Sequence, residues 1–235
     1  MSDFSKDVVI ITGAAGNLGQ AVTKQFLEKG AVVCGLDHQT GRTAHWVPAE
    51  YTGKFIACDG VDVTDRDRML TLPPGVHAKA GKATILVNAL GGYLAGETVF
   101  ELSSRTWERM LALNVTSFLN LSAAFLPDLL ENRRGKLIAV SAKAGLQGGA
   151  KSGAYAASKA ALLRLVESQA AEVGPMNIQV NAVVPGVLDT PQNRAAMPSA
   201  DISKWVSVDE LARVILFLCS PEADRINGAA LPVYG

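Results

Sequence analysis

The sequence predicts an α/β fold, in which a parallel, doubly wound sheet of roughly seven strands carries helices on both faces. Short runs rich in β-branched residues alternate with longer helical patterns along the whole chain, which is typical of a parallel sheet. These runs are apolar without regular polar alternation, as expected for strands covered on both faces. No linker, internal repeat or low-complexity segment divides the 235 residues. We therefore expect one domain spanning residues 1–235.

The elements follow from apolar, β-branched runs and from helical spacing between them. The first strand is expected at Val8–Thr12, and the helix after it ends at Gly30, because glycine commonly follows the last helical turn. Six more strands are expected, at Ala31–Leu36, Lys54–Cys58, Ala83–Ala89, Lys136–Ser141, Ile178–Val184 and Ala229–Tyr234. Three further helices are expected, at about Thr106–Leu130, after Ser152, and at about Val208–Cys219.

Composition and charge narrow the class of protein. Hydrophobic residues make up 49% of the chain and charged residues 19%, which is enough to bury a core. The formal net charge is zero, so no basic field predicts nucleic-acid binding. The first residues lack a long apolar segment, and no stretch has the roughly 18 uninterrupted apolar residues of a membrane span. We expect a soluble, cytoplasmic protein without a membrane partner.

Cysteine and histidine do not indicate a disulfide framework or a metal site. The three cysteines are far apart in apolar runs, as small buried hydrophobic residues would be: Cys34, Cys58 and Cys219. The three histidines have no metal-ligand spacing: His38, His45 and His77.

A glycine-rich segment separates the first strand from the first helix. Gly13, Gly16 and Gly19 have the roles a dinucleotide requires: a tight turn, close approach of a pyrophosphate, and packing of helix on strand. The start of the helix then offers free N–H groups to the anion. A simple turn is the alternative, but the position between strand and helix favours nucleotide binding.

Asp37 at the end of the second strand bears on the choice of nucleotide. Its distance from the glycines suits a carboxylate that binds the 2′-hydroxyl of the adenosine ribose. Such a carboxylate repels a 2′-phosphate, which favours NAD(H). A helix-capping role is the alternative reading of Asp37, and the nearby Arg42 leaves NADP(H) possible.

Tyr155 and Lys159 stand four residues apart at the start of a helical pattern. Residues at this spacing share a helix face. A cation beside a tyrosine lowers the tyrosine pKa from its usual value of about 10. The pair could therefore give and accept a proton.

These motifs, in this order over nearly the whole chain, resemble the short-chain dehydrogenase/reductase superfamily, whose fold is Rossmann-type. Thr12–Gly19 resembles its cofactor turn, with Asn17 where a glycine usually stands, and Tyr155-x-x-x-Lys159 matches its signature. Other matches are the adenine segment at Asp62 and Val63, the strand end at Asn88, with Ala89 in place of a second asparagine, the helix asparagine Asn114, and the Pro185-Gly186 segment.

The resemblance implies a role for each matching residue. Tyr155 would exchange a proton with the substrate. Lys159 would bind the nicotinamide ribose and lower the pKa of Tyr155, and Asn114 would hold a water in a proton relay. The cofactor-binding residues implied are Gly13, Gly16, Asn17, Leu18, Gly19, Asp37, Asp62, Val63, Asn88, Ala89, Gly91, Lys159, Pro185, Gly186, Leu188 and Thr190.

The serine of the family's active site is missing. Thirteen positions before Tyr155 stands Ala142. Ser141 is adjacent but should point to the other face of its strand, and Ser152 lies on the wrong side of the loop. Loss of an oxyanion donor costs about 10²–10³ in rate, so a substrate that needs less oxyanion stabilisation is favoured.

One branch of the superfamily, the dihydropteridine reductases, works without this serine and has a similar Ala-Lys-Ala segment. This chain has Ala142-Lys143-Ala144, and Tyr93 stands where that branch has a tryptophan. Residues 187–205 also resemble its substrate loop. A quinonoid dihydropteridine is therefore a possible substrate, with contacts from Tyr93, Ala142, Gln147 and Tyr155.

Two other functions stay open. An ordinary alcohol dehydrogenase or ketone reductase would need water, Gln147 or Ser152 in place of the serine. A nucleotide sensor without catalysis would explain the absent serine, but it would not need Tyr155. In each case a small molecule is the partner. The apolar helices that carry Asn114 and Tyr155 also predict a homodimer or homotetramer, as the resemblance implies.

Overall fold

Seven parallel strands form the main sheet of the computed structural model, which describes residues 2–41, 43 and 45–235. The strand order is β3-β2-β1-β4-β5-β6-β9, and every neighbouring pair runs parallel. The predicted doubly wound α/β fold with roughly seven strands is confirmed. The order reverses between β1 and β4, and at such a switch point an open α/β sheet binds its ligand.

The strands lie close to the predicted ranges. They are β1 (Val8–Thr12), β2 (Val32–Asp37), β3 (Phe55–Asp59), β4 (Ile85–Asn88), β5 (Gly135–Val140), β6 (Ile178–Pro185) and β9 (Ala230–Val233). The main helices are α1 (Asn17–Glu28), α4 (Ser104–Leu111), α5 (Ser117–Asn132), α6 (Gly153–Val173) and α8 (Val208–Cys219). Apart from β1 and α8, whose predicted bounds are correct, the ends differ by a few residues, since a hydrophobic run does not fix where pairing stops.

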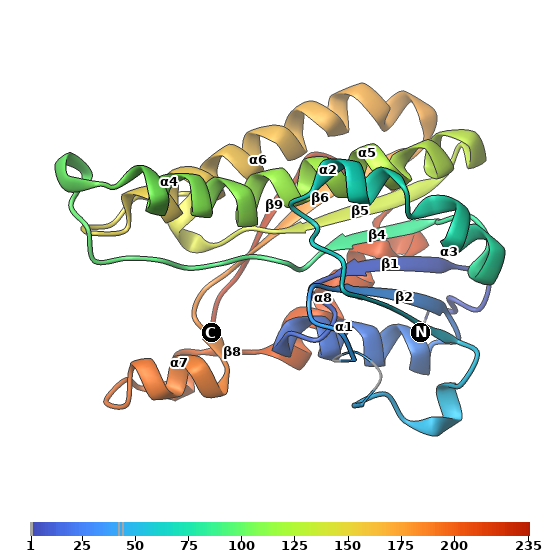
Figure 1. The fold of residues 1–235 in the computed structure, drawn as a ribbon, viewed down its shortest axis with the longest axis horizontal. Coiled ribbons are helices and arrows are strands. Elements are labelled where there is room, and N and C mark those ends of the chain that lie inside the picture. The colour runs from blue at the N-terminus through green and yellow to red at the C-terminus, as the bar shows by residue number, and fades with distance from the viewer. Residues whose placement is uncertain (1, 42, 44) are drawn as a thin grey trace.

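Both faces of the sheet are buried, which explains the unbroken apolar strands. In β1, Val8 and Ile10 join one core cluster with α2, α3, α5 and α6, while Val9 and Ile11 join a second cluster with α1 and α8. Alternate residues of a strand point to opposite faces, so each strand contributes to both clusters. Figure 1 shows α4, α5 and α6 over one face of the sheet and α1 and α8 over the other.

Several short elements are not predicted from the sequence. They are α2 (Arg66–Leu70), α3 (Pro73–Ala80), α7 (Pro191–Ala196) and a small separate sheet of β7 (Leu188–Asp189) and β8 (Val206–Ser207). Local capping fixes α2 and α7, because Asp65 accepts from Arg68 N and Thr190 accepts from Asn193 N. Side-chain caps of this kind stabilise helices too short to show a hydrophobic period.

The helix predicted at about Thr106–Leu130 is longer and is interrupted. A π-helical turn, Ala112–Thr116, joins α4 to α5. The combined run Ser104–Asn132 is long and apolar enough to cross a membrane by length and composition, and half of its most apolar window is buried. It carries buried polar side chains, including Asn120 and Asp128, and it packs on the sheet, as a core helix does. The expectation of no membrane span stays a prediction.

The cysteines fit the interpretation of small core residues. Cys34 and Cys219 are buried, Cys58 is half-buried, and all three are free thiols. Burial raises the pKa of the Cys34 thiol to about 12, so this thiol is unreactive at neutral pH.

Candidate active site

The glycine-rich turn lies between β1 and α1, at the switch point of the sheet. Gly13 has φ +67°, and a Cβ on Gly19 would lie 2.1 Å from the Gly13 carbonyl oxygen. Gly16, which has no side chain to cap α1, occupies the N-cap position, and the first turn has no acidic residue. The first N–H groups of a helix have no partner within it. The turn is therefore shaped and polarised for a phosphate group.

Asn17 links this turn to the other side of the site. Its Nδ2 donates to Oε1 of Gln192 on α7 over 2.7 Å. Both side chains are near the surface, 175 positions apart in the sequence. The residue that replaces the usual glycine thus joins the glycine turn to α7.

Asp37 ends β2 with its carboxylate against the same turn. Its oxygens accept from Ala15 N at 3.3 Å and Gln39 N at 3.1 Å, and the residue is 5% exposed. The carboxylate therefore lies where a dinucleotide's adenosine ribose would be recognised. Arg42, which kept NADP(H) possible, lies outside the described residues.

The segment predicted to contact adenine has its own internal contacts. The Asp62 carboxylate accepts from Thr64 N and Oγ1, and these bonds lower its pKa. Val63 is buried, and its carbonyl accepts from Asn120 Nδ2. The residue before Asp62, Val61, donates its N–H to Asp37 O at 2.9 Å, which holds the loop after β3 beside the carboxyl end of β2.

Asn88 forms buried hydrogen bonds at the switch point of the sheet. Its Oδ1 accepts from Thr12 Oγ1 at 2.8 Å, and the same hydroxyl accepts from Leu90 N. The side chain is fully buried and also reaches Ser117 Oγ at 3.4 Å. The amide of Asn88 therefore ties the ends of β1 and β4 together and holds the segment with Ala89 and Gly91 in place.

Asn114 lies in the π-helical turn, a kind of distortion frequent at functional sites. Its Nδ2 donates to Gly92 O and to Ser158 Oγ, each at 3.0 Å, and its Oδ1 accepts from Gly92 N. A Cβ on Gly91 would lie 3.1 Å from both Asn114 Oδ1 and Lys159 Nζ. Two of the three predicted catalytic side chains therefore meet at Gly91.

Lys159 and Tyr155 share one face of α6, as their spacing predicts. Lys159 Nζ lies 6.0 Å from the Tyr155 ring centroid and donates to Val140 O at 2.8 Å. Lys159 is 4% exposed, and burial lowers the pKa of its ammonium to about 8. The lysine is therefore close to its titration point under physiological conditions.

The predicted lowering of the tyrosine pKa is wrong for this structure. Burial, and secondarily the neighbouring Tyr93, raise the pKa of Tyr155 to about 12. The rings of Tyr93 and Tyr155 pack edge to face with centroids 4.9 Å apart. Desolvation disfavours the charged phenolate, so Tyr155 is a protonated donor at neutral pH.

The nearby serine hydroxyls are engaged elsewhere. Ser141 Oγ donates to Lys159 O at 3.0 Å and is buried, as the strand alternation predicts. Ser152 Oγ donates to Gly149 O. Ala142 is buried at the position of the missing serine, while Gln147 is exposed in the loop beyond it.

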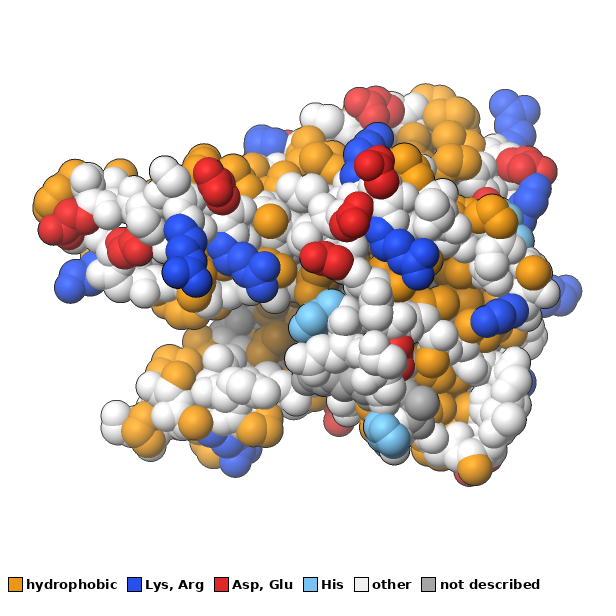
Figure 2. All heavy atoms as spheres, viewed as in Figure 1, with side chains coloured by type: hydrophobic (Ala, Val, Ile, Leu, Met, Phe, Trp, Pro, Cys, Tyr) orange, Lys and Arg blue, Asp and Glu red, His pale blue; other side chains and the backbone are white. Residues whose placement is uncertain are grey.

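The remaining predicted residues belong to the end of β6 and to the segment that follows it. Pro185 ends β6, Gly186 N donates to Val233 O at 3.0 Å, and Leu188 lies in β7. Thr190 caps α7. Figure 2 shows a hollow between an upper arm, formed by α4 and the loop before it, and a lower arm that carries α7. The predicted substrate loop, residues 187–205, includes α7 and lies in the lower arm.

Comparison with known proteins places the chain in a family. The model of the short chain dehydrogenase family matches residues 7–201. The chain belongs to this family. A 3-oxoacyl-(acyl-carrier-protein) reductase FabG of Thermotoga maritima is 29% identical, with 97% of this chain and 96% of the relative covered.

Two further relatives of this short chain dehydrogenase are informative. The 7alpha-hydroxysteroid dehydrogenase of Escherichia coli K12 is 30% identical, with 96% of this chain and 92% of the relative covered. The L-sorbose reductase of Gluconobacter frateurii, solved with NADPH and L-sorbose, has a TM-score of 0.89 and 26% identity, covering 98% and 96% of the two chains. These relatives do not support the predicted link to the dihydropteridine reductases.

One contact of this short chain dehydrogenase does not follow from any sequence motif. Lys143 Nζ lies 5.3 Å from the ring centroid of Tyr234. The two residues are 91 positions apart. The pairing of β5 with β6 and of β6 with β9 brings them together. The available signal was the position of Lys143 next to Ala142.

Proposed function

We propose that this protein is an NAD(P)-dependent oxidoreductase that interconverts a carbonyl group and an alcohol on a small molecule. The meeting of Asn114 and Lys159 at Gly91, with Tyr155 on the next turn of α6, carries the proposal. The names of the relatives describe reductases and a dehydrogenase acting on such groups. The uncapped start of α1 and the glycine turn fit the pyrophosphate of the nucleotide.

The chain's own residues supply proton transfer and orientation. Bound nicotinamide supplies the hydride for the carbonyl carbon. The Tyr155 hydroxyl donates its proton to the carbonyl oxygen, so that the product is a neutral alcohol. With a pKa of about 12, Tyr155 is fully protonated at neutral pH, which suits the direction of reduction. Lys159, with a pKa of about 8, is the group suited to returning a proton to Tyr155.

The cofactor contacts are proposed from the family pattern and the geometry together. The turn and α1 would hold the pyrophosphate, Asp37 the adenosine ribose, and Asp62 and Val63 the adenine. Lys159 would bind the nicotinamide ribose, and the nicotinamide side would be formed by Asn88, Ala89, Gly91, Pro185, Gly186, Leu188 and Thr190. The Asp37 carboxylate favours NAD(H), while the NADPH complex of the sorbose reductase keeps NADP(H) as the alternative.

Ala142 supports a second candidate substrate, a quinonoid dihydropteridine. Its conjugated, electron-poor ring needs a proton donor more than an oxyanion donor. Against it stand the names of the relatives, which describe no pterin. For a ketone, water or Gln147 would have to fill the place of the serine, because Ser152 Oγ is bound to Gly149 O.

Assays of NADH and NADPH oxidation against a panel of ketones, with quinonoid dihydropteridine included, test the proposal. Turnover of a ketone that is lost in Tyr155→Phe supports the carbonyl reductase. Turnover of the pterin alone supports the second candidate. If the protein binds the nucleotide but no substrate causes its oxidation, the result supports a nucleotide sensor without catalysis. If the protein binds no nucleotide, the result contradicts the carbonyl reductase, the pterin reductase and the sensor alike.

We also propose a homodimer or homotetramer. On α5, Leu119 is 41% exposed. Ala123, Leu126 and Leu130 follow it at helical spacing and are half-buried, and the two leucines also contact the core. Light scattering is expected to give a mass of two or four chains, and a monomer mass would contradict this.

A further inference from the structure

Lys143 occupies a position that the proposed mechanism does not use. It follows Ala142 directly and begins the short helical turn Lys143–Gly145. This turn packs on the Lys159 turn of α6, since a Cβ on Gly145 would lie 2.9 Å from the Lys159 carbonyl carbon. The backbone that carries Lys143 is therefore fixed relative to Lys159 and Tyr155.

The ammonium of Lys143 is held by an aromatic face and not by an anion. It lies 5.3 Å from the Tyr234 ring centroid, within the range of a cation–π contact. Among the residues that the structure describes, its Nζ makes no hydrogen bond and no ion pair. Two cations on the lower arm differ, because Arg194 pairs with Asp189 and Lys204 with Asp201.

Tyr234 places this charge near the proposed reaction centre. A Cβ on Gly186 would lie 3.7 Å from Tyr234 Cδ1, and Gly186 N donates to the carbonyl of the preceding residue, Val233. In Figure 1 the end of the chain lies between the two arms, where Figure 2 shows the hollow. The ammonium thus lies between the loop after β5 and the segment after β6, two walls of the substrate region.

We infer that Lys143, oriented by Tyr234, is a substrate-binding cation, and that the substrate is an oxo acid with its carboxylate close to the reacting carbonyl. This rests on the proposed carbonyl reductase function. A cation–π contact orients the ammonium without neutralising it. A carboxylate then forms the charge-assisted hydrogen bond that no side chain of the described chain provides.

Kinetics with a matched pair of substrates test the inference. Acetoacetate and methyl acetoacetate have the same ketone, but only the acid carries a charge. We expect the parent to prefer acetoacetate, and Lys143→Met to raise KM for acetoacetate by about ten- to a hundredfold with little change in kcat. KM for the ester should not change, and Lys143→Arg should restore most of the preference.

The control is Lys54→Met. Lys54 is exposed, as Lys143 is, but it lies just before β3, away from the carboxyl ends of the strands. This variant should leave both KM values unchanged. An equal rise in KM for acid and ester in Lys143→Met, or an equal effect of Lys54→Met, overturns the inference.

A binding measurement separates this inference from the proposed function. Calorimetry with NAD⁺ present compares acetoacetate with the ester in the parent and in Lys143→Met, and needs no turnover. Tighter binding of acetoacetate that is lost in the variant supports the inference even where no ketone is reduced. Equal binding, or no binding, of the two compounds overturns it even where neutral ketones are reduced.

Discussion

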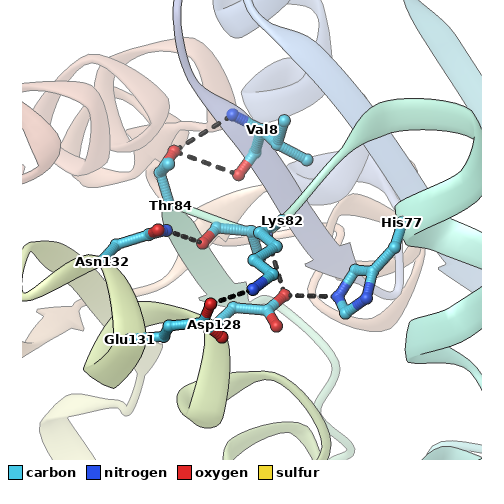
Figure 3. A network of polar contacts seen from close by, with 8 residues as sticks. Val8, His77, Lys82, Thr84, Asp128, Glu131 and Asn132 are labelled. Atoms are coloured by element: carbon cyan, nitrogen blue, oxygen red, sulfur yellow. Dashed lines mark hydrogen bonds and ion pairs between the residues drawn. The ribbon is translucent and has the colours of Figure 1, made fainter.

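The two ends of the sheet use similar polar residues in opposite ways. At the amino ends of β1 and β4, Asp128 accepts from Ala83 N at 2.9 Å and from His77 at 2.8 Å. Figure 3 shows this network, in which Lys82 forms an ion pair with Glu131 and Thr84 Oγ1 accepts a hydrogen bond from Val8 N. The polar groups at this end are paired with one another, as buried polar groups in proteins generally are.

At the carboxyl ends the pairing is incomplete. In the described chain, the Tyr155 hydroxyl has no hydrogen bond, the Lys143 ammonium has no anion, and no side chain caps α1. Lys159 is buried and forms no ion pair with a carboxylate of the described residues, and burial lowers its pKa. Polar groups that are hydrogen-bonded within the protein stabilise the fold. Polar groups without a partner in the protein are available to a ligand. The difference predicts that substitutions at the amino ends of the strands change stability, and that substitutions at the carboxyl ends change activity.

The largest effect is expected for Tyr155→Phe. Loss of the proton donor should lower kcat by about 10²–10⁴. The melting temperature should hardly change, since the lost hydroxyl makes no hydrogen bond within the described chain. Steady-state kinetics and thermal unfolding measure the two quantities. A variant that keeps its full rate would show that Tyr155 is not the acid.

Lys159→Met is expected to lose activity without losing stability. The folded-state pKa of about 8 lies below the usual lysine value of 10.5, so between these pH values the unfolded chain binds more protons than the folded chain. The free energy of unfolding of the parent therefore rises with pH across this window. At pH 7 the parent carries the cost of a buried charge, which methionine removes.

Thermal unfolding from pH 7 to 10.5 checks this pH dependence. The melting temperature of Lys159→Met should equal or exceed that of the parent at pH 7. As the pH rises through 8 to 10.5, the parent should gain stability relative to the variant. A parent that loses stability relative to the variant over this range contradicts the burial of a charged Lys159.

The sequence predicts the sheet and the central pair well because both depend on local spacing. β1 and α8 have their predicted bounds, and Tyr155 and Lys159 share a face because they are four residues apart. The pKa of Tyr155 was predicted in the wrong direction, because burial and the packing of Tyr93 depend on tertiary structure. For the same reason, the contacts Asn17–Gln192 and Lys143–Tyr234 are absent from any local pattern.

At the amino end, Asp128→Ala is expected to change stability alone. It leaves the Ala83 N–H buried without a partner, which costs about 1–3 kcal/mol and lowers the melting temperature by about 2–12 °C. Glu131→Ala on the same helix is the control, because exposed ion pairs such as Lys82–Glu131 contribute little. Unfolding and kcat are measured together, and a fall in kcat of the folded variant would contradict the separation of the two ends.

The smallest effect is expected for Asn17→Gly, which restores the usual glycine of the cofactor turn. It removes the hydrogen bond from Asn17 Nδ2 to Gln192 Oε1, and an exposed neutral bond contributes about 0.5–1.5 kcal/mol. If this bond holds α7 over the bound nucleotide, the Kd of NADH should rise about two- to tenfold. Gln192→Ala should have the same effect, and the double variant should be no weaker than either single variant, because all three lack one bond. Calorimetry of NADH binding measures the cycle. Additive losses would show that the two side chains act on the nucleotide separately, and that the glycine turn and α7 are not coupled.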